Sequence, residues 1–195
     1  MVAGVTTVHA AAQEATVSVV PASYTVPNDG LAFNVNVTIE NVNDLYGYQF
    51  ELFYPNDILN GTSVTQGPFL ETGGQPTFFD LANFTDNYNA TDGLINVVCL
   101  RTNPSAPGVN GDGVLAIIIF NSTSNSGPET LHLADVLLSN SNVSAIPFTT
   151  VDAQVTVVPE FPVALVLPLL MVLTLVAIAF GKKRETIEES SASFK

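Results

Sequence analysis

Six asparagines in this chain occur in the spacing Asn-x-Ser/Thr, the acceptor pattern for N-linked glycans. They are Asn36, Asn60, Asn83, Asn89, Asn121 and Asn142. Six of seventeen asparagines is more than the Ser and Thr content would give by chance. Such a glycan needs an exposed side chain in an exported protein, and because the carboxyl-terminal apolar segment predicts export, we expect some of these asparagines to be glycosylated.

No arrangement of nucleophile and base is visible in the sequence. Cys99 is the single cysteine, and His9 and His132 are the only histidines. The sequence contains no nucleophile elbow, no phosphate-binding glycine loop and no His or Cys set at metal-ligand spacing. We therefore predict that the chain is not an enzyme, and that Cys99 is a packed, inert thiol on one face of a strand with Ile95 and Val97.

One loop carries enough oxygen ligands to be considered for calcium. In "DNYNATDG", Asp86 and Asp92 flank a run of Asn and Thr, but without the ligand spacing of a helix-loop-helix calcium site. Such side chains could hold Ca²⁺ weakly, and ordinary turn chemistry is the favoured interpretation. We expect no cofactor.

Charge is distributed very unevenly along the chain. Residues 1–160 contain fifteen of the eighteen Asp and Glu but only one of the five Lys and Arg, Arg101, which gives a net charge of −14. So acidic a surface repels phosphate backbones, and nucleic acid is therefore excluded as a partner.

The carboxyl-terminal region has the composition of a membrane span. Residues 163–180 are apolar apart from Pro168 and Thr174 and would rise about 27 Å as a helix, close to the hydrocarbon thickness of a bilayer. The alternative is a buried core helix. The basic cluster Lys182, Lys183 and Arg184 follows directly.

These basic residues fix the expected orientation, because such clusters stay on the cytoplasmic side. We therefore predict a transmembrane helix over 163–181, a cytoplasmic tail over 182–195 and everything before the helix outside the cell. Residues 1–14 end in small residues suited to signal-peptidase cleavage, and we interpret them as the remnant of a signal peptide.

Between these ends the sequence predicts short strands and essentially no helix. Runs rich in Val, Ile, Phe and Tyr are separated by Pro, Gly, Asn and Asp. These runs are "ATVSVVP", "LAFNVNVTI", "YGYQFELFY", "PTFF", "GLINVVCLR", "GVLAIIIF", "ETLHLADVLL" and "AQVTVV". Eight or nine such strands predict one all-β sandwich over residues 15–158. The fully apolar "VLAIIIF" suggests a central strand covered on both faces.

Two stretches resemble the cohesin domain family. "LYGYQFELFYPNDILNG", residues 45–61, is similar to the third strand and following turn of cohesins, with Tyr54 where the family has Asp before the proline. "NGDGVLAIIIF", residues 110–120, resembles the family's Asp-Gly turn and the strand after it. The resemblance spans residues 15–158 and implies a nine-stranded, jelly-roll-like β-sandwich, related in architecture to carbohydrate-binding modules.

The resemblance also implies a partner. Cohesins bind dockerins, small calcium-loaded helical modules often joined to polysaccharide-degrading enzymes, through one flat sheet face that includes the third, fifth, sixth and eighth strands. In residues 48–54 the large apolar side chains alternate with Gln49, Glu51 and Phe53. This second set mixes one aromatic with polar groups, so we predict that it contacts the partner protein. The alternative is a merely solvated sheet face.

Two other functions remain open from the sequence. The first is a structural subunit or adhesin of a surface layer or filament. The second is direct binding of polysaccharide, for which the chain has no Trp and only Tyr24, Tyr46 and Tyr88 as aromatic candidates.

The segment before the apolar span resembles an archaeal sorting signal. Pro159, Glu160 and Phe161 give the Pro-Glu-Phe motif of such signals, within a short linker over 159–162. Either the helix is retained or a membrane sortase cuts near the motif, and both remain open. The prediction is a single-pass, cell-surface protein.

Overall fold

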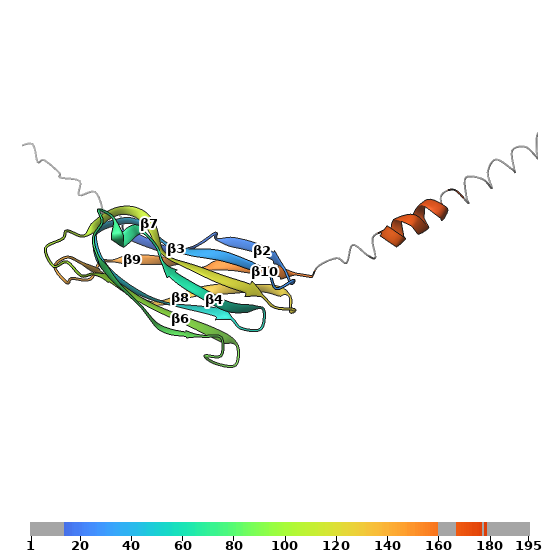
Figure 1. Ribbon diagram of the computed structural model, residues 1–195, viewed down its shortest axis with the longest axis horizontal. Coiled ribbons are helices and arrows are strands. Elements are labelled where there is room, and N and C mark those ends of the chain that lie inside the picture. Colours follow the sequence, from blue (N-terminus) through green and yellow to red (C-terminus); the bar gives the residue numbers. More distant parts are fainter. Residues whose placement is uncertain (1–13, 160–166, 177, 179–195) are drawn as a thin grey trace, which may run out of the picture. The chain divides into compact units, whose positions relative to one another are not determined.

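The computed structural model describes residues 14–159, 167–176 and 178. The chain divides into two units, Met1–Pro159 and Glu160–Lys195. In the first unit the described residues form ten strands and one short 3₁₀ helix (Figure 1). The strands are β1 (Ala15–Val20), β2 (Ser23–Pro27), β3 (Ala32–Pro55), β4 (Leu59–Gln66), β5 (Thr77–Thr85), β6 (Asp92–Arg101), β7 (Val109–Ser122), β8 (Gly127–Asn140), β9 (Phe148–Val151) and β10 (Ala153–Val158). The 3₁₀ helix is η1 (Phe69–Glu71).

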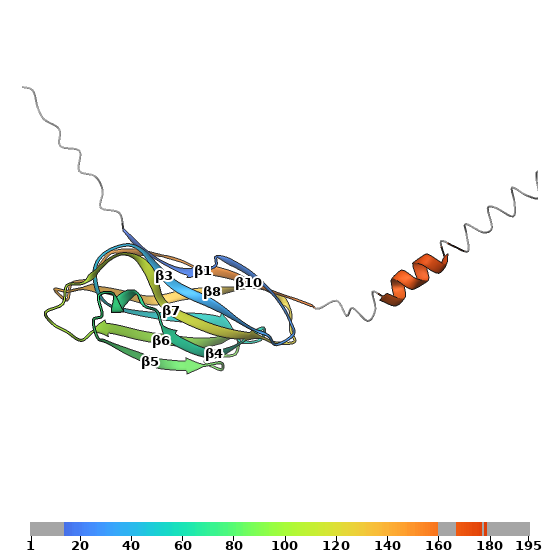
Figure 2. The same cartoon turned by 45° about the horizontal axis from the view of Figure 1, so that its top comes forward.

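The strands form two layers that share β3. Its first half pairs with β1 and β7, which extends the front sheet to β9-β1-β3-β7-β4. Its second half pairs with β6 and β8, which extends the back sheet to β2-β10-β8-β3-β6-β5. Figure 2 shows β5 at the edge of this sheet beside β6. The expected all-β sandwich is confirmed, and the expected count of nine strands becomes ten named strands in the described part.

The count differs from the expectation because two expected strands merge into one, and because β2, β4 and β9 match none of the eight runs expected as strands. Residues 32–55, expected as two strands, form one strand of 24 residues. Residues 148–158 form β9, which pairs with β1, and β10, which pairs with β8. Only Asp152 separates β9 from β10, and so short a break leaves no strong signal in the sequence, because both parts keep a similar composition.

The bend that carries β3 from one sheet to the other lies at Asn41 and Asp44. Both have positive φ values, 56° and 60°, a conformation that Asn and Asp tolerate better than most residues. The amide of Asn41 donates to Asp112 Oδ1 at 2.6 Å, and the amide of Asp44 donates to Asn110 Oδ1 at 2.7 Å. The "NGDG" stretch is therefore not a hairpin turn but the part of β7 that accepts hydrogen bonds from amides at the bend.

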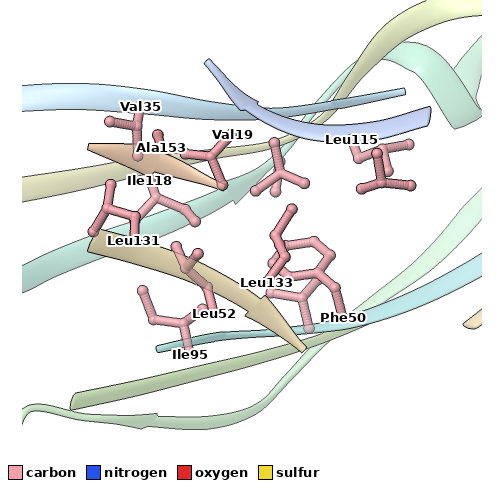
Figure 3. Packing of buried hydrophobic residues seen from close by; sticks show 14 of the residues in the cluster. Val19, Val35, Phe50, Leu52, Ile95, Leu115, Ile118, Leu131, Leu133 and Ala153 are labelled. Carbon is pink, nitrogen blue, oxygen red and sulfur yellow. The ribbon is translucent and has the colours of Figure 1, made fainter. Parts of the chain in front are cut away.

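The core lies between the two sheets. Alternate residues of the front sheet, such as Val19, Val35 and Ile118, face Leu52, Ile95 and Leu133 of the back sheet (Figure 3). Burying a side chain of this size contributes about 1.5 to 3 kcal/mol. In β7, Ile117 and Ile119 are only half-buried, so this central strand is packed on one face and partly open on the other.

In the second unit, residues 167–176 and 178 of the predicted membrane helix are helical. Among the residues described, no helix is both long and apolar enough to cross a membrane. Glu160 and Phe161 of the sorting motif and the basic cluster at 182–184 lie outside the described residues, as does the predicted leader up to residue 13.

Candidate protein-binding face

Gln49, Glu51 and Phe53 lie on the outer side of the back sheet. Their neighbours Phe50 and Leu52 are fully buried in the core, so the alternation expected from the sequence is present. We call the outward surface around them the back face. It consists of Gln49, Glu51 and Phe53 on β3, Asn96, Val98 and Leu100 on β6, Phe78, Asp80 and Asn83 on β5, and Leu137 on β8.

The middle of the back face is polar. The Asn96 side-chain nitrogen donates to Glu51 Oε1 at 2.7 Å. Asn96 lies directly opposite Asn83 on β5 and Glu51 on β3, so the three form one row across the sheet. In the part of the chain that the structure describes, the Asn96 side-chain oxygen is buried without a hydrogen-bond partner. The polar groups of this row that reach the surface are therefore those of Glu51 and Asn83.

One end of the back face is aromatic. Phe53 packs edge-on against Tyr88, with ring centroids 5.6 Å apart, and Tyr88 is half-exposed. The other two tyrosines considered for sugar stacking are engaged elsewhere. Tyr24 stacks on Phe33 at 5.0 Å, and the Tyr46 hydroxyl donates to the Asn103 carbonyl oxygen at 2.8 Å.

The other end is an apolar groove of about 360 Å³, which the sequence analysis did not predict. Its walls include Val98 and Leu100 of β6, Leu137 of β8 and Val143 of the following turn. Leu100, Leu137 and Val143 are 39%, 62% and 89% exposed. Aliphatic side chains grouped on one open face indicate a surface for another molecule.

A signal for this groove was present in the sequence. In "ADVLL", Val136 and Leu138 are buried, so the leucine between them must point outward. The same holds for Leu100, which follows the buried Cys99. A run of apolar residues in a strand with one solvated face marks such positions.

The turn that presents Val143 is held in an unfavourable conformation. Val143 has a φ of 60°, which is rare for a β-branched residue. The Asn140 side-chain oxygen accepts hydrogen bonds from the amides of Asn142 and Ser144, at 3.0 and 2.9 Å. Strain of this kind persists where the surroundings fix it and is typical of binding sites.

Asp44 ties this turn to the bend in β3. Its carboxylate accepts a hydrogen bond from the Ser141 hydroxyl at 2.7 Å and another from the Gly108 amide at 2.9 Å. The Ser141 hydroxyl, helped by the amides of Gly108 and Ser141, lowers the pKa of the Asp44 carboxyl. The bend between the sheets therefore also positions one wall of the groove.

Electrostatically the back face is acidic. Glu51, Asp80 and the exposed Asp135 lie on or beside it. Among the described residues Arg101 is the sole Lys or Arg, and it is only 3% exposed. The face therefore favours a partner that brings apolar and cationic groups.

The guanidinium of Arg101 supports the loops next to this sheet. It donates to three carbonyl oxygens, those of Leu70 at 2.9 Å, Thr72 at 2.6 Å and Pro107 at 2.6 Å. Within the described residues it has no ion-pair partner. Its role is therefore to join η1 and the residue that follows it to the loop before β7.

Cys99 is buried in β6, as expected from the sequence. Burial raises the pKa of its thiol to about 11. At pH 8 about one native thiol in a thousand would then be ionised. We expect a thiol-specific disulfide reagent at this pH to react at least about 100-fold more slowly with the native chain than with the chain in denaturant. Rapid reaction of the native chain would contradict the buried position of Cys99.

Asp86 and Asp92 are occupied by local hydrogen bonds. Asp86 Oδ1 accepts from the Tyr54 hydroxyl at 2.6 Å and from the Gly61 amide at 2.7 Å. Asp92 Oδ2 accepts from Thr91 and Asn89 side chains. Across residues 14–159, no group of three or more His, Cys, Asp or Glu is placed to hold a metal ion. The loop geometry agrees with ordinary turn chemistry.

The residue that departs from the family pattern, Tyr54, is fully buried. Its ring packs edge-on against Phe120 at 4.9 Å, and its hydroxyl bonds to Asp86. Burial and the neighbouring Asp86 carboxylate raise the pKa of Tyr54 well above its usual range. Gly93 lies against this ring and leaves room for it.

The six glycosylation sequences differ in accessibility. Asn60, Asn83, Asn89 and Asn142 are exposed, whereas Asn36 and Asn121 are half-buried, each with a buried side-chain oxygen that has no partner in the described part of the chain. The side chain of Asn89 is used in the turn at 89–92. Which of them are glycosylated stays a prediction.

Comparison with known proteins identifies relatives of this fold. The family model described as the cohesin domain matches residues 16–157. Among curated proteins, none matches the chain. A non-cellulosomal cohesin from the hyperthermophilic archaeon Archaeoglobus fulgidus is similar in structure, with a TM-score of 0.60 and 22% identity over 75% of this chain and 92% of that one.

Two solved complexes are similar as well. One is a type I cohesin–dockerin complex from Clostridium thermocellum, with a TM-score of 0.60 and 12% identity over 80% of this chain and 100% of that one. The other contains the sixth cohesin of scaffoldin B from Acetivibrio cellulolyticus with a dockerin, with a TM-score of 0.60 and 16% identity over 75% and 100%. At these identities the likeness shows the fold.

Proposed function

Because this chain belongs to the cohesin domain family, we propose that it captures a dockerin-bearing protein through its back face. The observation that supports this most directly is the apolar groove formed by Leu100, Leu137 and Val143 beside Gln49, on the same face of the back sheet as Glu51 and Phe53. The similar cohesins from Clostridium thermocellum and Acetivibrio cellulolyticus were solved in complex with dockerins.

The prediction that the chain is not an enzyme is confirmed by this membership, since cohesin domains are non-catalytic protein-binding modules. A link to polysaccharide would then come through the partner, because dockerins are often joined to polysaccharide-degrading enzymes. Direct binding of sugars has little support, since Tyr24 and Tyr46 are engaged in contacts within the domain.

The binding surface can be tested with two substitutions together. We expect the double variant Glu51→Arg and Phe53→Ala to bind its dockerin about 100-fold more weakly, because it reverses the central charge and removes the aromatic contact. The probes are purified dockerin modules encoded in the genome of the same organism, measured by calorimetry with and without a calcium chelator.

Thr65→Ala is the matched control, because Thr65 is an exposed residue of β4 in the front sheet. Unchanged affinity of the double variant would show that the partner binds elsewhere. A genome without any dockerin module would contradict the dockerin part of the proposal.

We also propose that the domain is held at the cell surface. The support is the sequence: an apolar stretch at 163–180 followed by Lys182, Lys183 and Arg184, and preceded by the Pro-Glu-Phe motif. We expect the native protein to sediment with membranes and to resist extraction with carbonate at high pH. An intact mass that stops near Glu160 would show that a sortase removes the helix, and a full-length protein in the soluble fraction would contradict the anchor.

A further inference from the structure

One of the six glycosylation sequences lies on the back face itself. Asn83 is exposed on β5, the edge strand that pairs with β6 alone (Figure 2). It lies opposite Asn96, which bonds to Glu51. Two strand spacings separate Asn83 from Glu51, a distance of about 10 Å across the sheet.

The glycosylation pattern here is Asn83-Phe84-Thr85, and the backbone of β5 turns its two defining residues, Asn83 and Thr85, outward. Phe84, between them, is turned inward and lies beside Gly61 of β4. Asn83 and Thr85 therefore face the same side, since residues two apart in a strand share a face. Thr85 is opposite Leu94, which is opposite Phe53 of the back face.

Four of the other sequences are less suited or lie apart, and the fifth, Asn142, is exposed in the turn before Val143, at the groove end of the back face and not in its polar row. Asn36 and Asn121 are half-buried in β3 and β7, strands that have neighbours on both sides. The Asn89 side-chain nitrogen, to which a glycan would be attached, donates a hydrogen bond to Asp92 Oδ2 at 3.0 Å. Asn60 is exposed but belongs to β4 of the front sheet.

We propose that Asn83 carries an N-linked glycan and that this glycan closes the back face to the partner protein. The inference depends on the proposed function and on exposure of the domain outside the cell. Glycosylation would divide the protein into two populations, one that binds and one that is shielded. Occupancy of Asn83 would thus set how much of the surface protein can capture a partner.

The attachment is a transfer from a polyprenyl-phosphate-linked oligosaccharide. The Asn83 side-chain nitrogen forms a bond to the anomeric carbon of the first sugar, and the bond from that carbon to the phosphate oxygen breaks. The nitrogen loses one proton, and the lipid phosphate leaves with the bonding electron pair and takes up a proton. No oxidant or reductant is needed.

A glycan at this position interferes with docking for a physical reason. It is bulky and strongly hydrated, whereas docking requires the row Asn83, Asn96 and Glu51 to lose water against a protein surface. A partner that covers about 800 Å² would extend well beyond the 10 Å between Asn83 and Glu51. The glycan and the partner would therefore occupy the same space.

The first measurement is the mass of the peptide that contains Asn83, from full-length protein purified from its native cells. We expect an added oligosaccharide mass on this peptide, lost in the Asn83→Gln variant. An unmodified peptide in all of the protein would overturn the proposal.

The second measurement needs no partner, because Cys99 is the only natural cysteine and is buried. Glu51→Cys places a single accessible thiol on the back face. We expect a polyethylene-glycol maleimide to label it at least about tenfold more slowly in the glycosylated chain than in the same chain with Asn83→Gln. Thr65→Cys on the front sheet should be labelled equally fast in both. Equal rates at Glu51→Cys would overturn the shielding.

The third measurement uses the dockerin modules described above. We expect Asn83→Gln protein from native cells to bind at least about tenfold more tightly than the glycosylated protein, and Asn60→Gln to have no effect. If unglycosylated protein binds no dockerin, the proposed function fails, while the labelling experiment still decides whether the face is shielded. If both forms bind equally, the regulation fails and the proposed function stands.

Discussion

Replacing Arg101 with methionine is expected to lower the free energy of unfolding by about 3 kcal/mol. Arg101 is 3% exposed, and its guanidinium donates to the carbonyl oxygens of Leu70, Thr72 and Pro107. Methionine fills a similar volume but leaves these three acceptors without a donor. Hydrogen bonds from a charged group contribute more than neutral ones, and the loss is only partly offset by removal of a buried charge. Urea unfolding of the full chain in mild detergent, followed by circular dichroism, measures it.

Two further variants make this result specific. Arg101→Lys should recover only part of the stability, because one ammonium cannot reach three carbonyls that the planar guanidinium contacts together. Thr102→Ala, which removes an exposed hydroxyl bonded to the Pro76 carbonyl oxygen at 3.2 Å, should cost no more than about 0.5 kcal/mol. A methionine variant as stable as the wild type would show that the two loops do not depend on Arg101.

Gly93→Ala is expected to destabilise the domain by about 3 kcal/mol, at the upper end of ordinary overpacking. A Cβ atom at Gly93 would lie 2.2 Å from Tyr54 Cζ and 2.4 Å from Tyr54 Cε2. The ring has little freedom to move, because it is fully buried against Phe120 and its hydroxyl is bonded to Asp86. The same urea experiment measures the loss.

The cause can be isolated by removing the ring. In a Tyr54→Leu background, Gly93→Ala should cost at least about 1.5 kcal/mol less, since the atoms it would meet are gone. Gly111→Ala is a poor control because Gly111 has a φ of 103°, at which an added side chain is strained whatever the space around it. Equal costs of Gly93→Ala in both backgrounds would contradict this account.

The all-β class of the fold could be predicted from the sequence, because the alternation of apolar and polar residues that indicates a strand involves only neighbouring residues. Phe50, Leu52 and Tyr54 are buried and Gln49, Glu51 and Phe53 face outward, as the pattern predicts. The strand boundaries were harder to predict, since the bend at Asn41 and Asp44 depends on Asn110 and Asp112, which are more than sixty residues away. A hydrogen bond between residues far apart in the sequence cannot be predicted from the order of apolar and polar residues around either of them.

The candidate site was partly predictable for the same reason. Its position on β3 follows from alternation, but the groove needs Leu100, Leu137 and Val143 from three separate segments. These three side chains come together because β6 and β8 both pair with β3 in the folded sheet, and this strand order cannot be predicted from each segment by itself. The place of Asn83 in a row with Glu51 likewise depends on the registers of two strand pairs.

The shared strand has a mechanical consequence. Since β3 contributes one uninterrupted backbone of 24 residues to both layers, a load applied by a bound partner at residues 49–53 passes directly along covalent bonds to residues 32–45. A domain built in this way should resist pulling in a single-molecule experiment up to one threshold force and then unfold in a single rupture event.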